Sequence, residues 1–349
     1  MSETLFSFAY LIIDLNVIKA YFQISMLLLL SNLITQCSFE NKKISINRNS
    51  VQSYIDTTNN RFQLESYLDR IPGDSLKKVF LFKTSYKFYK KNDSLEFRYW
   101  NDKSIEFSEE RNDTLGIAES YWDLGNFFYF NNLKDSSYYY YNKAYKFYKE
   151  TEAAFYAGRM LLNMAIIQSD ARDYTGSEIT TINSLRLLKP LNKHKQLYMA
   201  YNNLGVVFNG MHQYKDAIRY HEVALFHKKK LSGQISEAPT FNNIGVVYQN
   251  MGDYVSAGKY FKRALSEDNL IQRDPKLYAM VLDNLAYNNL KQGVEIGVEE
   301  DFHRALHLRD SIKHISGKAI NYIHLGEYYL TIKNDTGLAI RSFQKSRDL

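Results

Sequence analysis

The sequence predicts an all-α solenoid, in which helix-turn-helix units stack in a row, because a short pattern returns at a nearly constant spacing. The pattern is Leu, Ile or Met followed by a small residue, and its clearest copies read WDLG, LNMA, NNLG, NNIG, DNLA and IHLG. The small residues lie 40, 40, 40, 41 and 40 positions apart, and they are Gly125, Ala165, Gly205, Gly245, Ala286 and Gly326. A period of this size is the signature of units that cannot bury their apolar faces alone and therefore stack.

Each unit is predicted to contain two helices joined by a tight turn. A second small residue follows the first by nineteen positions in five copies, where a following helix would cross the first: Ala144, Ser184, Ala224, Ala264 and Ala305. An aromatic residue follows the first small residue by three positions in most copies: Phe128, Phe208, Tyr248 and Tyr329. Turn sequences such as MHQY at 211–214 and MGDY at 251–254 come next. Small residues let two helix backbones approach closely, so the pattern indicates packed helix pairs.

The first element, residues 1–37, is predicted to be a hydrophobic export signal or membrane anchor. Apolar residues dominate positions 9–35, and the run MLLLLSNLI at 26–34 leads to the only cysteine, Cys37. An apolar stretch followed by a polar segment resembles a secretory signal of the bacterial lipoprotein type, in which such a cysteine is lipidated after cleavage. The residue before it is Gln36, where that type prefers Gly, Ala or Ser. Cys37 is the lipidation candidate, and the alternative is a small apolar residue buried in a helix.

Residues 38–75 are expected to form a lead-in helix or linker, and residues 76–349 an array of about seven repeats. Thr84, Ser85 and Phe88 stand one period before the first clear copy, with Ser104 at the second small site, so the first repeat is degenerate. The last repeat passes through Ala339 and ends without a polar capping helix, which terminal repeats need for solubility. We therefore expect either that the natural chain continues or that another element covers this end.

The order of residues within each unit resembles the tetratricopeptide repeat, whose signature is a large apolar residue, Leu-Gly, Tyr, a turn and two alanines. The copy at 236–265 carries most of it, with Phe241, Ile244, Gly245, Tyr248, Gly252, Tyr254, Ala257, Phe261 and Ala264. The period exceeds the usual length of about 34 residues, as in kinesin light chains and bacterial sensory proteins. HEAT and armadillo arrays share the longer period but not this order. The resemblance implies a right-handed superhelical solenoid whose first helices line a concave face.

Composition and charge favour a soluble helical array over a nucleic-acid-binding protein. The chain is 45% hydrophobic, holds four prolines and has a modest formal charge of +6. Its densest basic run, the lysines at 228–230, falls near a junction between two repeats, so a nucleic-acid role has little support. The 29 tyrosines fit either recognition hot spots or an AT-rich genome, which would enrich Lys, Asn and Ile as well. A single cysteine allows no internal disulfide.

No catalytic, cofactor or metal motif emerges, so we expect no enzymatic activity, no cofactor and no metal site. His303 and His307 stand four positions apart, which could bring two imidazoles to one metal, but a site needs further ligands and a solvated helix face is the alternative. The string HEVALFH at 221–227 begins like the zinc-protease helix, yet Leu225 stands where its second histidine must be. The chain carries neither a Gly-rich phosphate loop nor a G-x-S-x-G elbow.

The resemblance places ligand recognition on the first helix of each unit. Family members use an Asn just before the Leu, Ile or Met to hold the backbone of an extended peptide, and the matching residues are Asn163, Asn203, Asn243 and Asn284. A carboxamide offers donors and an acceptor to a peptide group without demanding a particular side chain. The alternative is that these amides bond a neighbouring helix. Positions expected to set specificity are Asn202, Val206, Asn209, Asn242, Val246, Gln249, Asp283 and Tyr287.

The expected function is therefore non-enzymatic binding of a protein or peptide in the concave groove. No basic clamp for a C-terminal carboxylate occurs among these positions, so that ligand is not expected. With the export signal, the repeats resemble the extracytoplasmic sensory regions of Bacteroidetes histidine kinases and LuxR-type regulators. The alternative is a stand-alone lipoprotein adaptor that assembles an envelope complex. The expected location is the periplasmic side of a bacterial cell envelope, with membrane association through the N-terminus only, and the alternative location is the cytoplasm.

Overall fold

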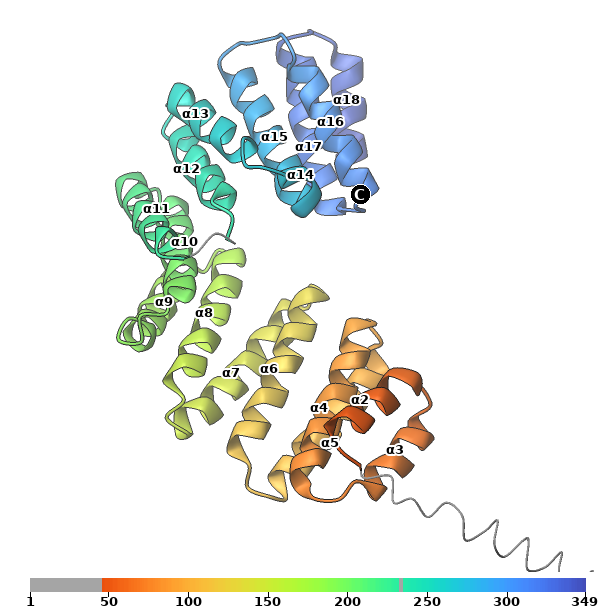
Figure 1. The fold of residues 1–349 in the computed structure, drawn as a ribbon. Helices are drawn as coiled ribbons and strands as arrows, with labels where there is room; N and C mark the ends of the chain where they lie inside the picture. The colour runs from red at the N-terminus through yellow and green to blue at the C-terminus, as the bar shows by residue number, and fades with distance from the viewer. Residues whose placement is uncertain (1–45, 232–234) are drawn as a thin grey trace, which may run out of the picture. The chain divides into compact units, whose positions relative to one another are not determined.

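The computed structural model describes residues 46–231 and 235–349, and no strand occurs within these two ranges (Figure 1). The predicted export signal and Cys37 lie outside the described residues. No helix in these ranges combines the length and the apolar character that crossing a lipid bilayer requires. The chain divides into two compact units, Met1–Lys91 and Asn92–Leu349.

Three helices make up the described part of the first unit. They are α2 (Arg48–Thr57), α3 (Arg61–Arg70) and α4 (Asp74–Lys90), so two of them occupy the segment expected to be a lead-in. The side chain of Asn47 caps the start of α2 by accepting hydrogen bonds from two backbone N–H groups. At the other end of α2, the ammonium group of Lys87 donates to the carbonyl oxygen of Thr58 at 2.6 Å. Hydrogen bonds therefore hold both ends of α2 in place.

The second unit is a continuous series of helices, most of them close to 17 residues long. Its earlier helices are α5 (Ser94–Glu109), α6 (Thr114–Phe130), α7 (Lys134–Glu150), α8 (Ala154–Asp170), α9 (Tyr174–Leu188), α10 (His194–Gly210) and α11 (Tyr214–Lys229). Its later helices are α12 (Ala238–Asn250), α13 (Tyr254–Leu265), α14 (Leu270–Arg273), α15 (Pro275–Lys291), α16 (Val298–Ser311), α17 (Ile315–Thr331) and α18 (Thr336–Arg347).

The helices pair as the repeat pattern predicts. The first helix of each repeat packs on the second in α6 with α7, α8 with α9, α10 with α11, α12 with α13, α15 with α16, and α17 with α18. Each second helix then packs on the first helix of the next repeat. From α8 onward, successive first helices also contact one another directly. The predicted all-α solenoid of helix-turn-helix repeats is therefore confirmed, whereas its right-handed superhelix stays a prediction.

The turns explain why the period is 40 residues. Helices end in a residue with left-handed backbone geometry, and these residues recur at steps of about 20 or 40 positions: Asn112, Asn132, Glu152, Arg172, Asn192, His212, Gly252, Gly293, Lys313 and Asn334. The N–H of the following residue bonds back over the helix end, as from Leu133 to the carbonyl of Phe128 at 2.8 Å. This is the Schellman helix ending. Helices such as α6 and α7 have 17 residues each, and the same three-residue turn follows both. A repeat therefore consists of two halves of equal length, which together make up the 40-residue period.

The predicted small residues lie where two helices cross. A methyl group added to Gly205 would come within 2.4 Å of the ring of His221, and Gly125, Gly245 and Gly326 face the rings of Tyr141, Phe261 and Phe343 in the same way. Where the repeat has Ala165, the residue sixteen positions later is the smaller Thr181, which is fully buried. The second set of small sites, from Ala144 to Ala305, is also fully buried. Small residues thus set the distance between the helices of a pair.

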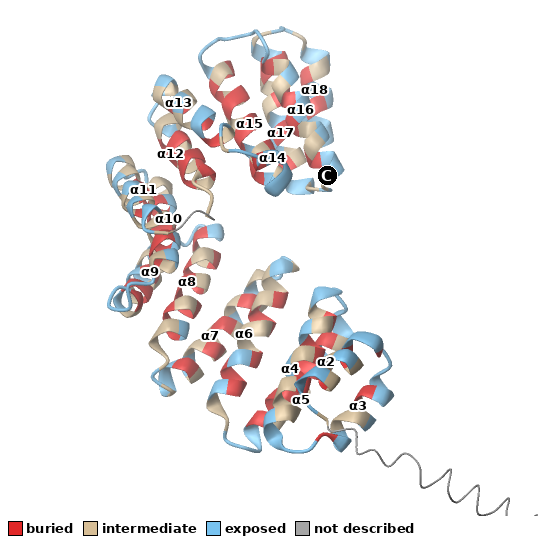
Figure 2. Ribbon diagram, viewed as in Figure 1, coloured by how far each residue is buried: buried red, intermediate tan, exposed pale blue. Residues whose placement is uncertain are grey.

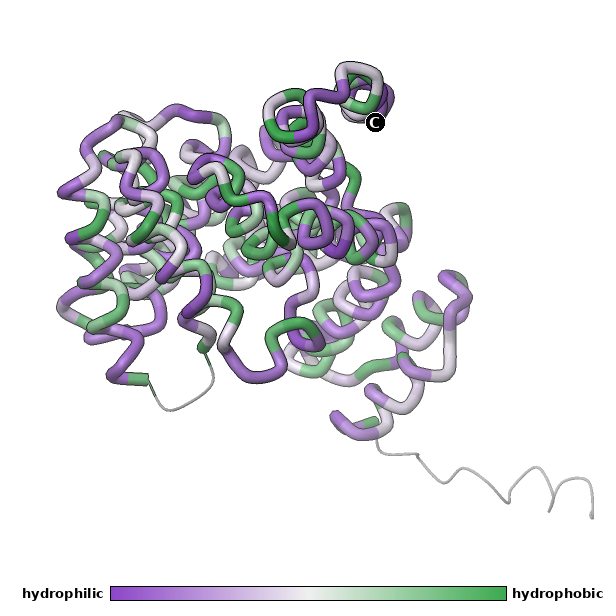
Figure 3. Tube along the Cα trace, turned by 90° about the horizontal axis from the view of Figure 1, so that it is seen from above, coloured by the Kyte–Doolittle hydropathy of each residue, from purple (hydrophilic) through white to green (hydrophobic). Residues whose placement is uncertain are grey.

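Burial follows the faces by which the helices meet. Buried residues run along the sides of the helices that face a neighbour, whereas the turns are mostly exposed (Figure 2). Hydrophilic and hydrophobic residues accordingly alternate along the tube when it is seen from above (Figure 3). Separate apolar clusters form around neighbouring repeats, for example around Leu204 and around Phe261. Stability is thus shared among neighbouring repeats, as expected of a solenoid.

Candidate functional site

The predicted binding residues lie on four successive first helices, α8, α10, α12 and α15. We call the surface that these helices share with α6 and α17 the first-helix face. Two positions before the small residue, each of these helices carries a polar side chain: Asp123, Asn163, Asn203, Asn243, Asn284 and His324. The face therefore presents one amide, carboxylate or imidazole per repeat, in register.

Asn203 uses its amide to join two repeats. The side chain is 7% exposed, and its NH2 group donates to the hydroxyl oxygens of Ser177 at 3.0 Å and Thr181 at 2.8 Å. Both acceptors lie on α9 of the preceding repeat. At this position the amide bonds the neighbouring helix, which is the alternative to peptide binding that the sequence left open.

Asn243 and Asn284 are only partly buried and belong to a chain of amides between α12 and α15. Asn284 donates to the side-chain oxygen of Asn242 at 2.9 Å, and Asn242 donates in turn to that of Asn243 at 3.5 Å. Asn242 is itself buried, at 3% exposure. The bonds leave the NH2 group of Asn243 without a partner in the part of the chain that the structure describes, so this group can meet a ligand.

The other predicted positions of α8, α10 and α12 differ in how far they reach solvent. Asn163, Val246 and Gln249 are partly buried, and Val206 is exposed. The oxygen of Asn209 accepts a hydrogen bond from Asn250 of the next repeat at 3.1 Å. The NH2 group of Gln249 is buried and unpartnered among the described residues. A buried donor without a partner costs free energy.

Asn202 contacts a buried histidine behind the face. The ring of His221 on α11 is fully buried, and its Nδ1 lies 3.0 Å from the side-chain oxygen of Asn202. An amide oxygen only accepts, so Nδ1 carries the proton. Burial lowers the pKa of His221 to about 4, and the ring is neutral at physiological pH. His221 thus fixes one lone pair of Asn202 and leaves its NH2 group directed elsewhere.

Asp283 holds three helices together. Its carboxylate, 1% exposed, accepts from Arg309 at 3.0 Å and from Asn321 at 3.0 Å. His324 lies 3.1 Å from the same carboxylate and stacks on Tyr287, with 4.1 Å between the ring centroids. These partners come from α16 and α17. Asp283 is thus occupied inside the protein, while Tyr287 remains partly buried at the first-helix face.

Sequence reasoning missed Asp123, which stands at the amide position of the first clear repeat. Burial and the nearby charge of Glu119 raise the pKa of Asp123 to about 7. The letters WDLG contain the signal, because every other repeat up to α15 carries a neutral Asn at this position. A partly buried carboxylate with a raised pKa marks a functional candidate.

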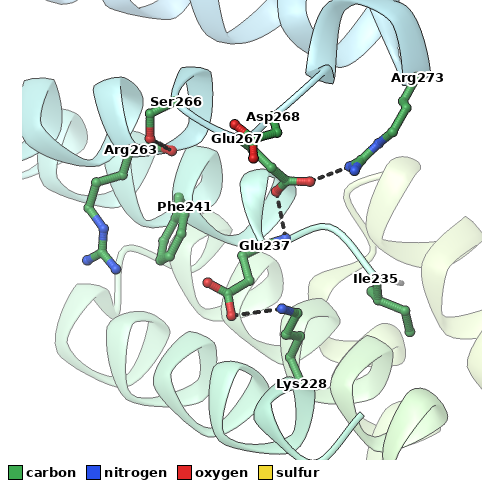
Figure 4. A pocket seen from close by; sticks show the side chains of 9 residues that line it. All are labelled: Lys228, Ile235, Glu237, Phe241, Arg263, Ser266, Glu267, Asp268 and Arg273. Carbon is green, nitrogen blue, oxygen red and sulfur yellow. Dashed lines mark hydrogen bonds and ion pairs between the residues drawn. The ribbon is translucent and has the colours of Figure 1, made fainter. Parts of the chain in front are cut away.

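A separate cavity of about 350 Å³ lies between α11, α12 and the short α14 (Figure 4). Glu267 accepts hydrogen bonds from the backbone N–H groups of Glu237 and Ala238, each at 3.0 Å, and thereby caps α12. Burial opposes ionisation of Glu267, but hydrogen bonds from Ser236 and Arg273 lower its pKa. Lys228 and Glu237 pair at 3.1 Å across the same cavity. The charged groups that line this cavity are largely paired with one another. These pairs link α11, α12 and α14, so we regard the cavity as part of the contact between two repeats.

The histidines that the sequence singled out lie apart from any cluster of ligands. His303 and His307 are exposed on α16, and His303 contacts the hydroxyl of Tyr329 at 3.3 Å. Within residues 46–231 and 235–349, no three His, Cys, Asp or Glu side chains are grouped so that they could hold a metal ion.

Several solved structures match most of this chain. Apo RapI is 18% identical, with a TM-score of 0.67, and 90% of each chain is covered. Aspartyl phosphate phosphatase F from Bacillus subtilis is 17% identical, with a TM-score of 0.64, over 84% of this chain and 77% of its own. NprR in complex with its cognate peptide NprX is 14% identical, with a TM-score of 0.59, over 82% and 81%. No protein-family model matches the chain, and no curated protein matches it in sequence.

At these identities the likeness concerns the fold. The repeat signature, the paired helices and the matched structures agree on one architecture, and the chain has the fold of the tetratricopeptide-repeat proteins.

Proposed function

We propose that the protein binds an extended peptide along its first-helix face. The observation that carries the proposal is the row of polar side chains in register on contacting first helices, in which Asn163, Asn243 and Asn284 remain partly open to solvent. Carboxamides suit the repeating donors and acceptors of a peptide backbone. The similar structure of NprR holds its cognate peptide, which supports the same class of ligand here.

The predicted binding residues fall into two groups, those that are open to solvent and those that are buried within the protein. Asn163, Asn243 and Asn284 bind the peptide backbone, and the side chains next to them contact the peptide's own side chains: Asn202, Val206, Asn209, Val246, Gln249 and Tyr287. Asn203, Asn242 and Asp283 are buried and bonded within the protein, so we assign them to holding the repeats in place.

We infer that recognition, not catalysis, is the role of this chain. The predicted binding positions on α8, α10 and α12 are amides and apolar groups, which bind ligands but cannot act as general acids or bases near neutral pH. One similar structure is a phosphatase, but at 17% identity that likeness concerns the fold. The binding role rests on the amide row.

We further propose that the chain is the extracytoplasmic sensory region of a signal-transduction protein. The support is the apolar segment at 9–35, followed by Cys37 and a polar stretch, which is typical of exported lipoproteins. Sequencing the N-terminus of the protein purified from its native cells tests this: a lipid-modified Cys37 is expected, whereas an intact N-terminus in the soluble cell fraction would contradict it.

The binding proposal is tested by selecting peptides from a random library on the immobilised chain and measuring affinity by calorimetry. Replacing Asn163 and Asn243 together by Ala should weaken a selected peptide about tenfold or more, because each lost hydrogen bond contributes about 1 kcal/mol. Asn142→Ala, on the second helix α7, is the matched control and should bind as the parent does. A library that yields no peptide above background would contradict the proposed function.

A further inference from the structure

A further cavity lies within the first unit, where α2 packs against α4 (Figure 1). Its volume is about 620 Å³, and its lining comes from these two helices and from Lys91, the residue that follows α4. We call it the α2–α4 cavity. Small-molecule sites have volumes of about 300–1,000 Å³, whereas a stable protein–protein interface buries about 800 Å² on each partner. The size of this cavity therefore favours a small ligand.

The lining of the α2–α4 cavity is strongly basic. Its charged side chains are four lysines and one carboxylate, which gives a net charge of +3: Lys83, Lys87, Lys90, Lys91 and Asp56. The carboxylate of Asp56 accepts a hydrogen bond from Gln52 at 2.7 Å. None of the four ammonium groups forms an ion pair with a carboxylate in the part of the chain that the structure describes. An excess of positive charge therefore surrounds the cavity.

Two of the four lysines hold the helices of this unit together. Lys87 donates to the carbonyl oxygens of Ile55 and Thr58, the latter at 2.6 Å. Lys91 donates to the side-chain oxygen of Asn59 at 2.9 Å. Burial and the charge of Lys91 lower the pKa of Lys87. These acceptors are neutral, so they satisfy the donors but leave the two positive charges uncompensated.

The other two lysines are available to a ligand. Lys83 is partly buried and makes no hydrogen bond, ion pair or ring contact with the described residues. Lys90 is exposed, and its ammonium group lies 4.7 Å from the centre of the Tyr86 ring. Both lie three or four positions from Lys87, so the three charges share one side of α4 and repel one another. An anion in the cavity would relieve this repulsion.

Two aromatic rings form an apolar wall of the same cavity. Phe82 and Tyr86 line it from α4, and each side chain is 45% exposed. Their ring centroids lie 6.2 Å apart, and the ring planes are within 2° of parallel. Adjacent exposed apolar side chains mark a binding surface. Parallel rings suit a flat group of a ligand, because aromatic systems pack favourably against one another.

We propose that the α2–α4 cavity binds a small organic anion that joins a flat apolar ring to a carboxylate or phosphate group. The ring packs on Phe82 and Tyr86, and the anionic group accepts hydrogen bonds from Lys83 and Lys90. Lysine ammonium groups bind either kind of anion as point charges. This ligand differs from the peptide proposed for the first-helix face, and neither proposal depends on the other.

A first test needs no ligand. Lys83→Met should leave the melting temperature unchanged or raise it, because the charge of Lys83 is repelled by Lys87 and has no internal partner to lose. Lys87→Met should lower it, because two carbonyl oxygens lose their donor. A loss of stability in Lys83→Met as large as that in Lys87→Met would mean that Lys83 serves the fold, and the proposed site would be rejected.

The second test titrates the full chain at pH 7.5 with three naphthalene probes that carry their substituent at the same ring position. They are naphthoate, naphthyl phosphate and the uncharged naphthalene methanol, and calorimetry measures affinity and stoichiometry. One anionic probe should bind at one site per chain, about tenfold or more tightly than the alcohol. The better of the two anions distinguishes a carboxylate ligand from a phosphate ligand.

Variants locate the probe in the cavity. Lys83→Met combined with Lys90→Met should weaken the anionic probe about tenfold or more and leave the alcohol unchanged. Phe82→Ala should weaken both kinds of probe. Lys77→Met is the matched control, since Lys77 is also partly buried on α4 but does not line the cavity, and it should bind as the parent does.

Three results would overturn the proposed anion site. They are the absence of binding by both anions, an alcohol that binds as tightly as they do, and anions that bind the double lysine variant as well as the parent. Each of them leaves the peptide-binding function standing, because the peptide selection addresses helices of the second unit.

Discussion

His221 shows how one side chain at a helix crossing adjusts to its neighbour. It stands sixteen positions after Gly205, where three other repeats place an aromatic ring against a small residue: Tyr141, Phe261 and Phe302. The imidazole is fully buried, and its Nε2 has no partner among the described residues. The repeat that contains Gly205 thus has a titratable imidazole at a position where an apolar aromatic ring would fill the same space.

The stability of the second unit should therefore depend on acidity through His221. Its pKa falls from 6.5 to about 4 on folding because burial disfavours the charged ring. The stabilisation is complete above pH 6.5 and is lost as pH falls towards 4, by about 3 kcal/mol in all. Urea unfolding between pH 8 and pH 4.5 measures this. His221→Phe should remove this contribution, whereas the exposed His307→Gln should keep it; an unchanged pH dependence in His221→Phe would refute the assignment.

The burial of individual amides could not be predicted from the sequence. The four amides Asn163, Asn203, Asn243 and Asn284 share one position in the repeat, yet Asn203 is buried. The difference comes from Ser177 and Thr181, two hydroxyl residues of the preceding helix that accept from Asn203. The repeat pattern gives the position of an amide, but its partners depend on residues that vary between repeats.

At the scale of the helix, the turn is the element that sets the period. Among the described residues of the second unit, ten positions at helix ends have left-handed geometry, and eight of them carry a side chain other than hydrogen. An L-residue pays about 1–2 kcal/mol for that geometry, which Gly does not. The turns were predicted from sequences such as MGDY, but their uniform geometry at Glu152 or Arg172 could not be, because neither residue favours it.

Arg172→Gly should consequently stabilise the protein by about 1 kcal/mol. Arg172 is exposed, and its φ of 62° lies in the left-handed region. The reciprocal change, Gly252→Ala, should destabilise by a similar amount, because a methyl group there meets no atom within 4 Å and only the backbone is strained. Chemical denaturation compares the two. Equal stabilities of both variants and the parent would show that the turn geometry does not limit stability.

Turns were predicted well where the repeat is regular. The predicted turn at 211–214 joins the end of α10 to the start of α11, and the one at 251–254 joins α12 to α13. By contrast, the fourth clear repeat has a second helix of only 12 residues, α13, followed by the four-residue α14. The step of 41 residues between Gly245 and Ala286 signals one inserted residue, but the break depends on the bonds that Glu267 makes to α12.

At the scale of the whole molecule, the second unit is a chain of local interfaces. The buried pair of Asp283 and Arg309 belongs to one of them and links α15, α16 and α17. Breaking a buried ion pair by removing one partner costs about 3–5 kcal/mol, because the remaining charge is left unpaired. In a solenoid that cost is felt mainly by neighbouring repeats.

Asp283→Ala should therefore raise hydrogen exchange in α15, α16 and α17 while α6, α7 and α8 keep their protection. Mass spectrometry of peptic fragments resolves the two regions. Asp301→Ala is the matched control, since its partner Arg304 is 54% exposed and such a pair contributes about 1 kcal/mol or less. An equal loss of protection along α6 to α18 would show that the second unit unfolds as one cooperative block.

The sequence by itself determined the all-α class, the helix pairs, the crossing points at small residues and the row of amides, because each follows from a spacing that repeats. Only the tertiary structure decided which amides are open to solvent and that Asp123 forms no ion pair with a basic residue among the described residues. It also placed the rings of Trp122, Tyr148 and Tyr156 together. The physical reason is that burial and pairing depend on side chains from neighbouring helices, which stacking brings together and which no fixed period encodes.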